Sequence, residues 1–83
     1  MEQERFNKLT QMQKLLLIME SGRLVLEKKD DEKLLKLYVY KRFYVEVAYD
    51  LDKNKILTIR TPDMDEVVDE YLGFLNIDDI LNL

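Results

Sequence analysis

Apolar and polar residues follow two different periods along this chain, and the change of period marks the expected elements. Residues 34–60 contain three runs rich in β-branched and aromatic residues, separated by two polar turns, which is typical of neighbouring β-strands. On either side of this stretch, apolar residues recur three and four positions apart, as they do on one face of a helix. The sequence therefore predicts strands in the middle of the chain and helices on both sides of them.

A first helix is expected over residues 4–20. The large apolar residues that would turn toward the core are Phe6, Leu9, Met12, Leu16 and Met19. Gly22 follows, and a glycine at this point is typical of a left-handed helix end. Residues 15–19 are apolar nearly all round the helix, so we expect them to be buried under the C-terminal segment. A contact with a second subunit is the alternative.

Short turns are expected to join four strands into an antiparallel meander. The expected strands cover residues 23–29, 34–39, 43–50 and 55–60. The aspartates at 30–31 suit the first turn because this residue tolerates left-handed backbone. Residues 52–54 fit a three-residue hairpin loop with Asn54 in the left-handed conformation, and this loop opposes Val47 to Ile59.

The length of the turn between the second and third strands decides which side chains share a face. A three-residue loop over 40–42 opposes Leu37 to Val45 and gathers the apolar residues on one face. A two-residue loop over 41–42 would oppose Leu37 to Glu46 and mix the faces. It also lacks the glycine or asparagine that tight hairpin turns favour. We therefore expect the three-residue loop, with a single bulged strand through this region as another possibility.

The threonine, proline and aspartate at 61–63 give the clearest local signal, the start of a second long helix. Threonine is a good N-cap, proline suits the first helical position, and aspartate is favourable in the first turn. The apolar positions that follow keep a helical period as far as Leu75. Asn76 can cap a short terminal helix over residues 77–81.

These elements predict one α+β domain over residues 1–83, built as a two-layer sandwich. Its order is an N-terminal helix, a four-stranded antiparallel β-meander, a C-terminal helix and a short terminal helix. The helices would cover the apolar face of the sheet and leave the other face open. The candidate partner-binding residues on that open face are Tyr38, Tyr44, Lys36, Glu46 and Arg60. Tyrosine and arginine are common at protein interfaces, although a half-polar face in solvent is the alternative.

The amino-acid composition limits the kinds of catalytic and metal-binding site that the chain can form. The 83 residues include no cysteine and no histidine, so disulfides, zinc or haem ligation and histidine-based catalysis are not expected. The carboxylates at 30–32, 50 and 52 match no calcium-loop pattern and are expected to serve turns and solubility. We therefore expect no catalytic, cofactor-binding or metal-binding residues. A ligand cleft near Tyr49 and Tyr71 is the minor alternative.

Charge is distributed unevenly along the chain. Seven of the seventeen acids follow Pro62, whereas the thirteen bases all precede it together with ten acids. The C-terminal part therefore carries −7 and the rest +3. The helix–strand–helix order is similar in topology to double-stranded-RNA-binding domains, but a pI near 4.8 argues against nucleic-acid binding. No apolar run is long enough for a membrane span, no signal sequence is evident, and a cytoplasmic location is expected.

The sequence therefore favours a small non-enzymatic protein-interaction module. Its partner would be another protein or a second copy of the chain, which would form a homodimer through the open sheet face or an edge strand. An acidic, inhibitor-like or antitoxin-like protein that binds a basic surface through its C-terminal helix is the alternative. A small-ligand-binding protein or a metal-independent enzyme ranks behind both.

Overall fold

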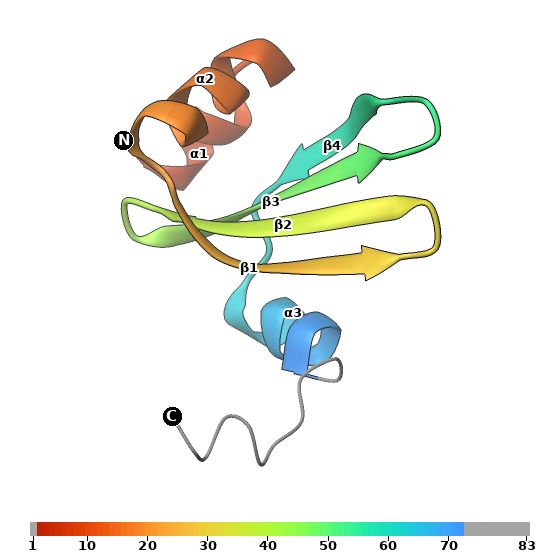
Figure 1. Cartoon of the computed structure of the whole chain (residues 1–83). Coiled ribbons are helices and arrows are strands. Elements are labelled where there is room, and N and C mark those ends of the chain that lie inside the picture. Colours follow the sequence, from red (N-terminus) through yellow and green to blue (C-terminus); the bar gives the residue numbers. More distant parts are fainter. Residues whose placement is uncertain (1, 73–83) are drawn as a thin grey trace.

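The computed structural model describes residues 2–72, and it has an α+β fold with a four-stranded antiparallel sheet between two groups of helices (Figure 1). The elements are α1 (Gln3–Asn7), α2 (Gln11–Ser21), β1 (Arg23–Asp30), β2 (Lys33–Tyr40), β3 (Phe43–Asp50), β4 (Lys55–Arg60), α3 (Met64–Val67) and a π-helical turn, η1 (Val68–Leu72). The predicted class, the meander order β1-β2-β3-β4 and the flanking helices are confirmed. The short terminal helix expected over 77–81 lies outside the described residues.

The turn between β2 and β3 has two residues, so the predicted three-residue loop is wrong. Tyr40 pairs with Phe43, and Leu37 lies opposite Glu46. Lys41 takes the left-handed conformation, with φ of 57°, at a cost of about 1–2 kcal/mol for a residue with a Cβ. Packing offsets this cost, because the rings of Tyr40 and Phe43 both contact Phe6, at centroid distances of 5.6 and 5.5 Å.

The other two turns agree better with the sequence, although the second joins Asp50 to Lys55 through four residues and not the predicted three. Asn54 has a φ of 53°, as predicted, and the first turn has its aspartate Asp31 at a φ of 55°. Val47 pairs with Ile59, also as predicted. A bulge then shifts the register at the end of this hairpin, because Ala48 pairs with Thr58 and Tyr49 with Ile56, which leaves Leu57 of β4 unpaired.

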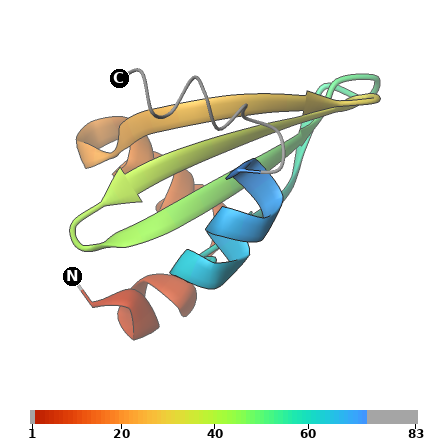
Figure 2. The same ribbon diagram turned by 90° about the horizontal axis from the view of Figure 1, so that it is seen from below.

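Helices lie on both faces of the sheet, as Figures 1 and 2 show. One face carries Val45 and Val47 and is covered by α1 and α2. The opposite face carries Leu37 and Glu46 and is covered by α3 and η1. The expectation that all helices cover one face is therefore wrong. The two-residue turn does place Leu37 and Glu46 on one face. Because helices cover both faces, this mixture leaves no apolar face in solvent, and the objection to the short turn no longer applies.

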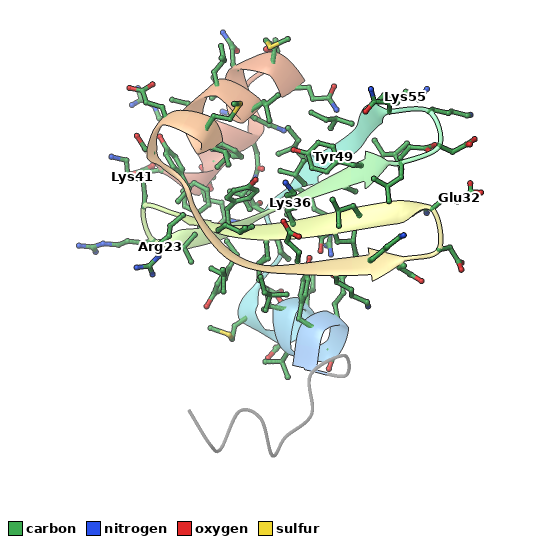
Figure 3. The ribbon with its side chains drawn as sticks, in the orientation of Figure 1. Arg23, Glu32, Lys36, Lys41, Tyr49 and Lys55 are labelled. Carbon is green, nitrogen blue, oxygen red and sulfur yellow. The ribbon has the colours of Figure 1, made fainter. Side chains whose placement is uncertain are left out.

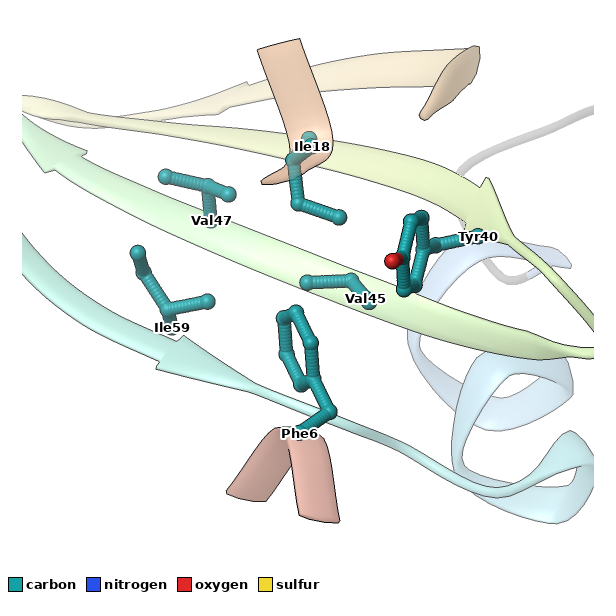
Figure 4. Close-up of a cluster of buried hydrophobic side chains, with 6 residues drawn as sticks. All are labelled: Phe6, Ile18, Tyr40, Val45, Val47 and Ile59. Carbon is teal, nitrogen blue, oxygen red and sulfur yellow. The ribbon is translucent and has the colours of Figure 1, made fainter. Parts of the chain in front are cut away.

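The larger apolar cluster joins α1 and α2 to the sheet (Figure 4). Its buried members are Phe6, Ile18, Tyr40, Val45, Val47 and Ile59. Phe6 is completely buried although α1 has only five residues. Because so short a helix is not stable alone, burial of this one ring is the main contact that holds α1 in place.

The N-terminal region forms two helices instead of the single helix expected over 4–20. The first helix ends at Asn7, and Thr10 caps the second, because its hydroxyl accepts from the Gln13 backbone N–H at 3.2 Å. The Gln13 side chain in turn accepts from the Thr10 N–H at 3.0 Å. The left-handed end predicted at Gly22 is also wrong, since its φ is −79°. A Cβ there would lie 2.6 Å from the Ile18 carbonyl oxygen, so a close approach explains the glycine.

The C-terminal helix starts two residues later than expected. Asp63, and not Thr61, is its N-cap, and the Asp63 carboxylate accepts from the Glu66 N–H at 2.8 Å. The Thr61 hydroxyl instead accepts from the Gln3 and Asn7 side-chain amides, each at 3.0 Å. The segment between β4 and α3 is thereby tied to α1, which fixes where the chain crosses to the second face.

Candidate interaction surface

The outer side of α2 exposes a row of large apolar side chains. Met12 is 64% exposed, Leu16 58% and Met19 75%. They are spaced four and three residues apart, so they lie above one another on one face of the helix. We call Met12, Leu16 and Met19 the α2 stripe. These three residues were expected in the core, and the structure shows that this expectation is wrong.

The inner side of α2 explains why the stripe faces outward. Ile18 is buried in the larger cluster, and Leu15 and Leu17 pack against it while partly exposed. At 100° per residue, Leu16 is turned about 160° away from Ile18. Because α2 is apolar around most of its circumference and the sheet covers only one side of it, some of its apolar residues must remain outside.

A shallow hollow adjoins the stripe. It has a volume of about 280 Å³ and is lined by Leu9, Gln13, Leu16 and Leu17. Three of the four lining side chains are apolar, and one of them belongs to the stripe. The surface is therefore a ridge beside a depression, a shape that can interlock with another apolar helix.

Charge is nearly absent from this surface. α2 contains one lysine and one glutamate, with no acid in its first turn and no base in its last. Lys14 lies 5.9 Å from the Phe6 ring centroid, so it belongs to the inner part of the helix. Glu20, at the C-terminal end, is exposed. The stripe can therefore approach an apolar partner without burying a charge.

The five candidate residues of the sequence analysis do not share one face. Tyr38 and Lys36 lie on the face covered by α1 and α2, opposite Val45 and Val47 respectively. The Lys36 ammonium is 3.7 Å from the Glu27 carboxylate. It also lies 5.5 Å from the ring centroid of Tyr49 on the next strand. Both side chains are labelled in Figure 3.

Tyr44, Glu46 and Arg60 lie on the other face, which is not open. Tyr44 packs against the smaller apolar cluster of Leu37, Val67 and Tyr71, so a helix of the same chain covers it. The expectation of an uncovered sheet face carrying all five residues is therefore wrong. Its physical cause is the one-residue difference in turn length, which moves β2 side chains to the opposite face from those predicted.

Glu46 is the centre of a polar network on that second face. It is 3% exposed, and its two carboxylate oxygens accept from the Arg60 Nε at 2.8 Å and Nη2 at 3.3 Å. The Tyr71 hydroxyl donates to the same carboxylate at 2.7 Å. Glu46 lies directly opposite Arg60 across β3 and β4, whereas Lys36, on the other face, does not join them.

These contacts shift the pKa values of the group. Burial alone raises the pKa of the Glu46 carboxyl, but the hydrogen bonds from Arg60 and Tyr71 outweigh it and hold that pKa below its ordinary value. Burial, together with the hydrogen bond to the Glu46 carboxylate, raises the pKa of the Tyr71 hydroxyl. Burial and the nearby Glu46 charge raise the pKa of Glu70. The network is therefore built around an ionised Glu46 and a protonated Tyr71.

Two acids of the segment formed by α3 and η1 make contacts within the same chain. Arg60 donates through Nη1 to Glu66 and through Nη2 to Glu70, each at 2.6 Å. The Lys28 ammonium donates to the backbone carbonyl of Glu70 at 3.2 Å. These contacts attach η1 to the sheet, so Glu66 and Glu70 are less available to a basic partner than the charge count suggests.

The features considered for ligands or catalysis are not brought together. Tyr49 packs against the cluster below α1 and α2, whereas Tyr71 belongs to the cluster on the opposite face, so they share no cleft. The turn carboxylates line an open hollow of about 570 Å³, formed by Asp30, Asp31, Glu32, Lys33 and Asp50. Among residues 2–72, no group of three or more acids is placed to hold a metal ion.

Comparison with models of known protein families found no match, and searches among curated proteins and solved structures found none either. Within the described part of the chain, no helix has the length and apolar character that crossing a membrane requires.

Proposed function

We propose that the protein is a small non-enzymatic protein-interaction module that binds a second copy of itself through the α2 stripe. The observation that carries this proposal is the exposure of Met12, Leu16 and Met19 in one row on a helix whose other side anchors it to the core. Contiguous apolar patches on a small domain are typical of interaction sites. Methionine suits such a surface because its side chain adapts to the shape of the partner.

A second copy fits this surface for a reason of symmetry. In a two-fold dimer the same patch meets itself, so it must be compatible with its own charge and shape. The stripe carries no charge, and α2 as a whole is balanced by one lysine and one glutamate. Two stripes can therefore meet without like-charge repulsion at the contact, although the whole chain has a net charge of −4.

The expected dimer is weak. Burying the six stripe side chains of two copies contributes on the order of 10 kcal/mol, and association costs roughly 4–15 kcal/mol. One helix face is also smaller than the ~800 Å² per partner of a standard interface. We therefore expect dissociation in the micromolar to millimolar range, which decides the concentrations at which the dimer must be sought.

Sedimentation velocity over about 10 μM to 1 mM tests the proposal, because weak dimers form in this range. The wild type should shift from monomer to dimer as concentration rises, whereas the Leu16→Glu variant should remain a monomer. Met64→Glu is the matched control, since Met64 is 56% exposed on α3, on the other side of the sheet. This control should dimerise like the wild type.

Two results would overturn the proposal. One is a wild type that stays monomeric up to about 1 mM. The other is a dimer that survives Leu16→Glu or is lost equally in Met64→Glu, which would place the contact elsewhere. Far-ultraviolet circular dichroism of each variant confirms that it is folded. A charge at an exposed site should change the free energy of unfolding by no more than about 0.5 kcal/mol.

A further inference from the structure

Resting on this proposed function, we infer that the two copies pair with their α2 helices antiparallel, so that Met12 of each copy contacts Met19 of the other. A two-fold axis then passes between the helices beside Leu16. The second copy completes the surface, because its Leu16 fills the hollow next to the stripe. Spacing, end charges and the position of the hollow support this arrangement.

The spacing of the stripe is nearly symmetric about its middle residue. Met12 lies four residues before Leu16 and Met19 three residues after it. At a rise of about 1.5 Å per residue these offsets are about 6 and 4.5 Å along the helix. An antiparallel pair exchanges the two directions, so Met12 comes within about 1.5 Å of the level of Met19 in the second copy.

The end charges of α2 select the antiparallel orientation. A helix has a positive N-terminal end and a negative C-terminal end, and α2 has no acid in its first turn and no base in its last. In an antiparallel pair about Leu16, the exposed Glu20 comes level with Met12, in the first turn of the other copy's α2. In a parallel pair, Glu20 would face Glu20 beside two negative helix ends, which is unfavourable.

The hollow accounts for the central contact. Its lining includes Leu9 and Gln13 on the N-terminal side of Leu16, and Leu17 beside it. In the antiparallel register, Leu16 of the second copy lies close to the level of the first and can enter this space. The contact is reciprocal, as when one side chain enters a gap among four others in packed helices. Leu16 is therefore the residue on which affinity depends most.

The absence of cysteine from the chain allows a direct test of the register by cross-linking. Single Leu16→Cys, Met12→Cys and Met19→Cys variants are oxidised at a concentration where the wild type is dimeric by sedimentation. Leu16→Cys should cross-link to itself. Met12→Cys and Met19→Cys should each cross-link poorly alone but efficiently when mixed. Met64→Cys, on the opposite side of the sheet, is the control and should not cross-link.

The outcomes separate this inference from the function on which it rests. Efficient self-cross-linking of Met12→Cys and of Met19→Cys would show a parallel pair and overturn the register. A dimeric wild type whose stripe cysteines do not cross-link would place the dimer contact elsewhere and overturn the register and the stripe together. A wild type that sediments as a monomer under the same conditions would overturn the proposed function itself.

Neutralising Glu20 tests the orientation by a second route. Glu20→Gln should raise the dimer dissociation constant by about 3- to 30-fold, the effect of losing two favourable charge contacts at helix ends. Asp69→Asn removes the same charge from the exposed surface of η1 and should leave the constant unchanged. A tighter dimer in Glu20→Gln would contradict the antiparallel pair, because it would show that the two glutamates repel each other.

Discussion

The two faces of the sheet are buried by different kinds of interaction. On one face, α1 and α2 bring Phe6 and Ile18 against apolar strand residues. On the other, Val67 and Tyr71 make a smaller apolar cluster, and a charged network around Glu46 fixes η1 to the sheet. Both faces are closed within one chain, the first mainly by apolar contacts and the second also by a buried charged network.

This difference decides which helix keeps apolar surface for a partner. The hydrogen bonds of the Glu46 network require defined geometry, so the C-terminal helical segment uses its polar groups against the sheet. Apolar burial is non-directional, and α2 is held against the sheet by the burial of Ile18 and its neighbours. The remaining apolar residues of α2, among them Leu16, face outward. The helix with the less specific anchor therefore carries the candidate interface.

The largest effect is expected from Phe6→Ala, which removes the only buried residue of α1. It leaves a cavity beside Tyr40 and Phe43 and loses two ring contacts. The free energy of unfolding should fall by about 3–5 kcal/mol, a large part of the stability of a domain of this size. Urea denaturation measures this loss. The slope of the free energy of unfolding against urea concentration should stay unchanged.

Met19→Ala is the control for that experiment. Met19 is three-quarters exposed, so its truncation should change the free energy of unfolding by no more than about 0.5 kcal/mol when the protein is dilute enough to be monomeric. A loss below about 1 kcal/mol for Phe6→Ala would contradict the apolar anchoring of this face.

The second face should be destabilised most by a substitution that leaves a buried charge without its partner. Arg60→Met takes the guanidinium donors away from the buried Glu46 carboxylate, and a buried charge without its ion-pair partner is costly. The expected fall in the free energy of unfolding is about 3 kcal/mol. Lys36→Met, which removes the longer and more exposed ion pair with Glu27, should cost no more than about 0.5 kcal/mol.

A double variant identifies the cause of that loss. Glu46→Gln combined with Arg60→Met removes both charges. The Tyr71 hydroxyl can still donate a hydrogen bond to the amide oxygen of the new glutamine. The double variant should be more stable than Arg60→Met alone, by at least about 1 kcal/mol. If it is no more stable, the loss comes from missing arginine packing, and the comparison between the two faces fails.

Much of the sheet could be predicted from local sequence signals. The left-handed Asn54, the pairing of Val47 with Ile59 and the meander order all follow from turn chemistry and alternation. The turn at Lys41 could not be predicted in this way, because its sequence argues for a longer loop. Its two-residue form is stabilised by aromatic contacts with Phe6, which is distant in the sequence and unknown until the fold is formed.

The candidate surface was misjudged for a related reason. Apolar spacing alone places Met12 and Leu16 on a core face, yet Ile18 fits an inner face equally well because residues 15–19 are almost uniformly apolar. One signal was available: Thr10 and Gln13 form a capping box, which begins a new helix and separates α2 from the period set by Phe6. Which side of α2 meets the sheet still depends on long-range packing.

The smallest effect concerns alkaline pH and separates the two faces by their tyrosines. The pKa of the Tyr71 hydroxyl is raised above its ordinary value of 10.0 by burial and by the hydrogen bond to Glu46. Above pH 10, the unfolded chain loses this proton while the folded chain keeps it. The contribution of Tyr71 to the free energy of unfolding should therefore fall by about 1.4 kcal/mol per pH unit.

Tyr71→Phe should abolish that part of the alkaline slope, and it should cost about 1–3 kcal/mol at neutral pH because Glu46 loses a donor. Tyr38→Phe is the comparison on the other face. Burial also raises the pKa of Tyr38, but among residues 2–72 no carboxylate accepts a hydrogen bond from its hydroxyl, so its slope should be smaller. Urea unfolding from pH 9 to about pH 11 measures both differences. Equal slopes in the wild type and Tyr71→Phe would show that the Tyr71–Glu46 contact does not control this face.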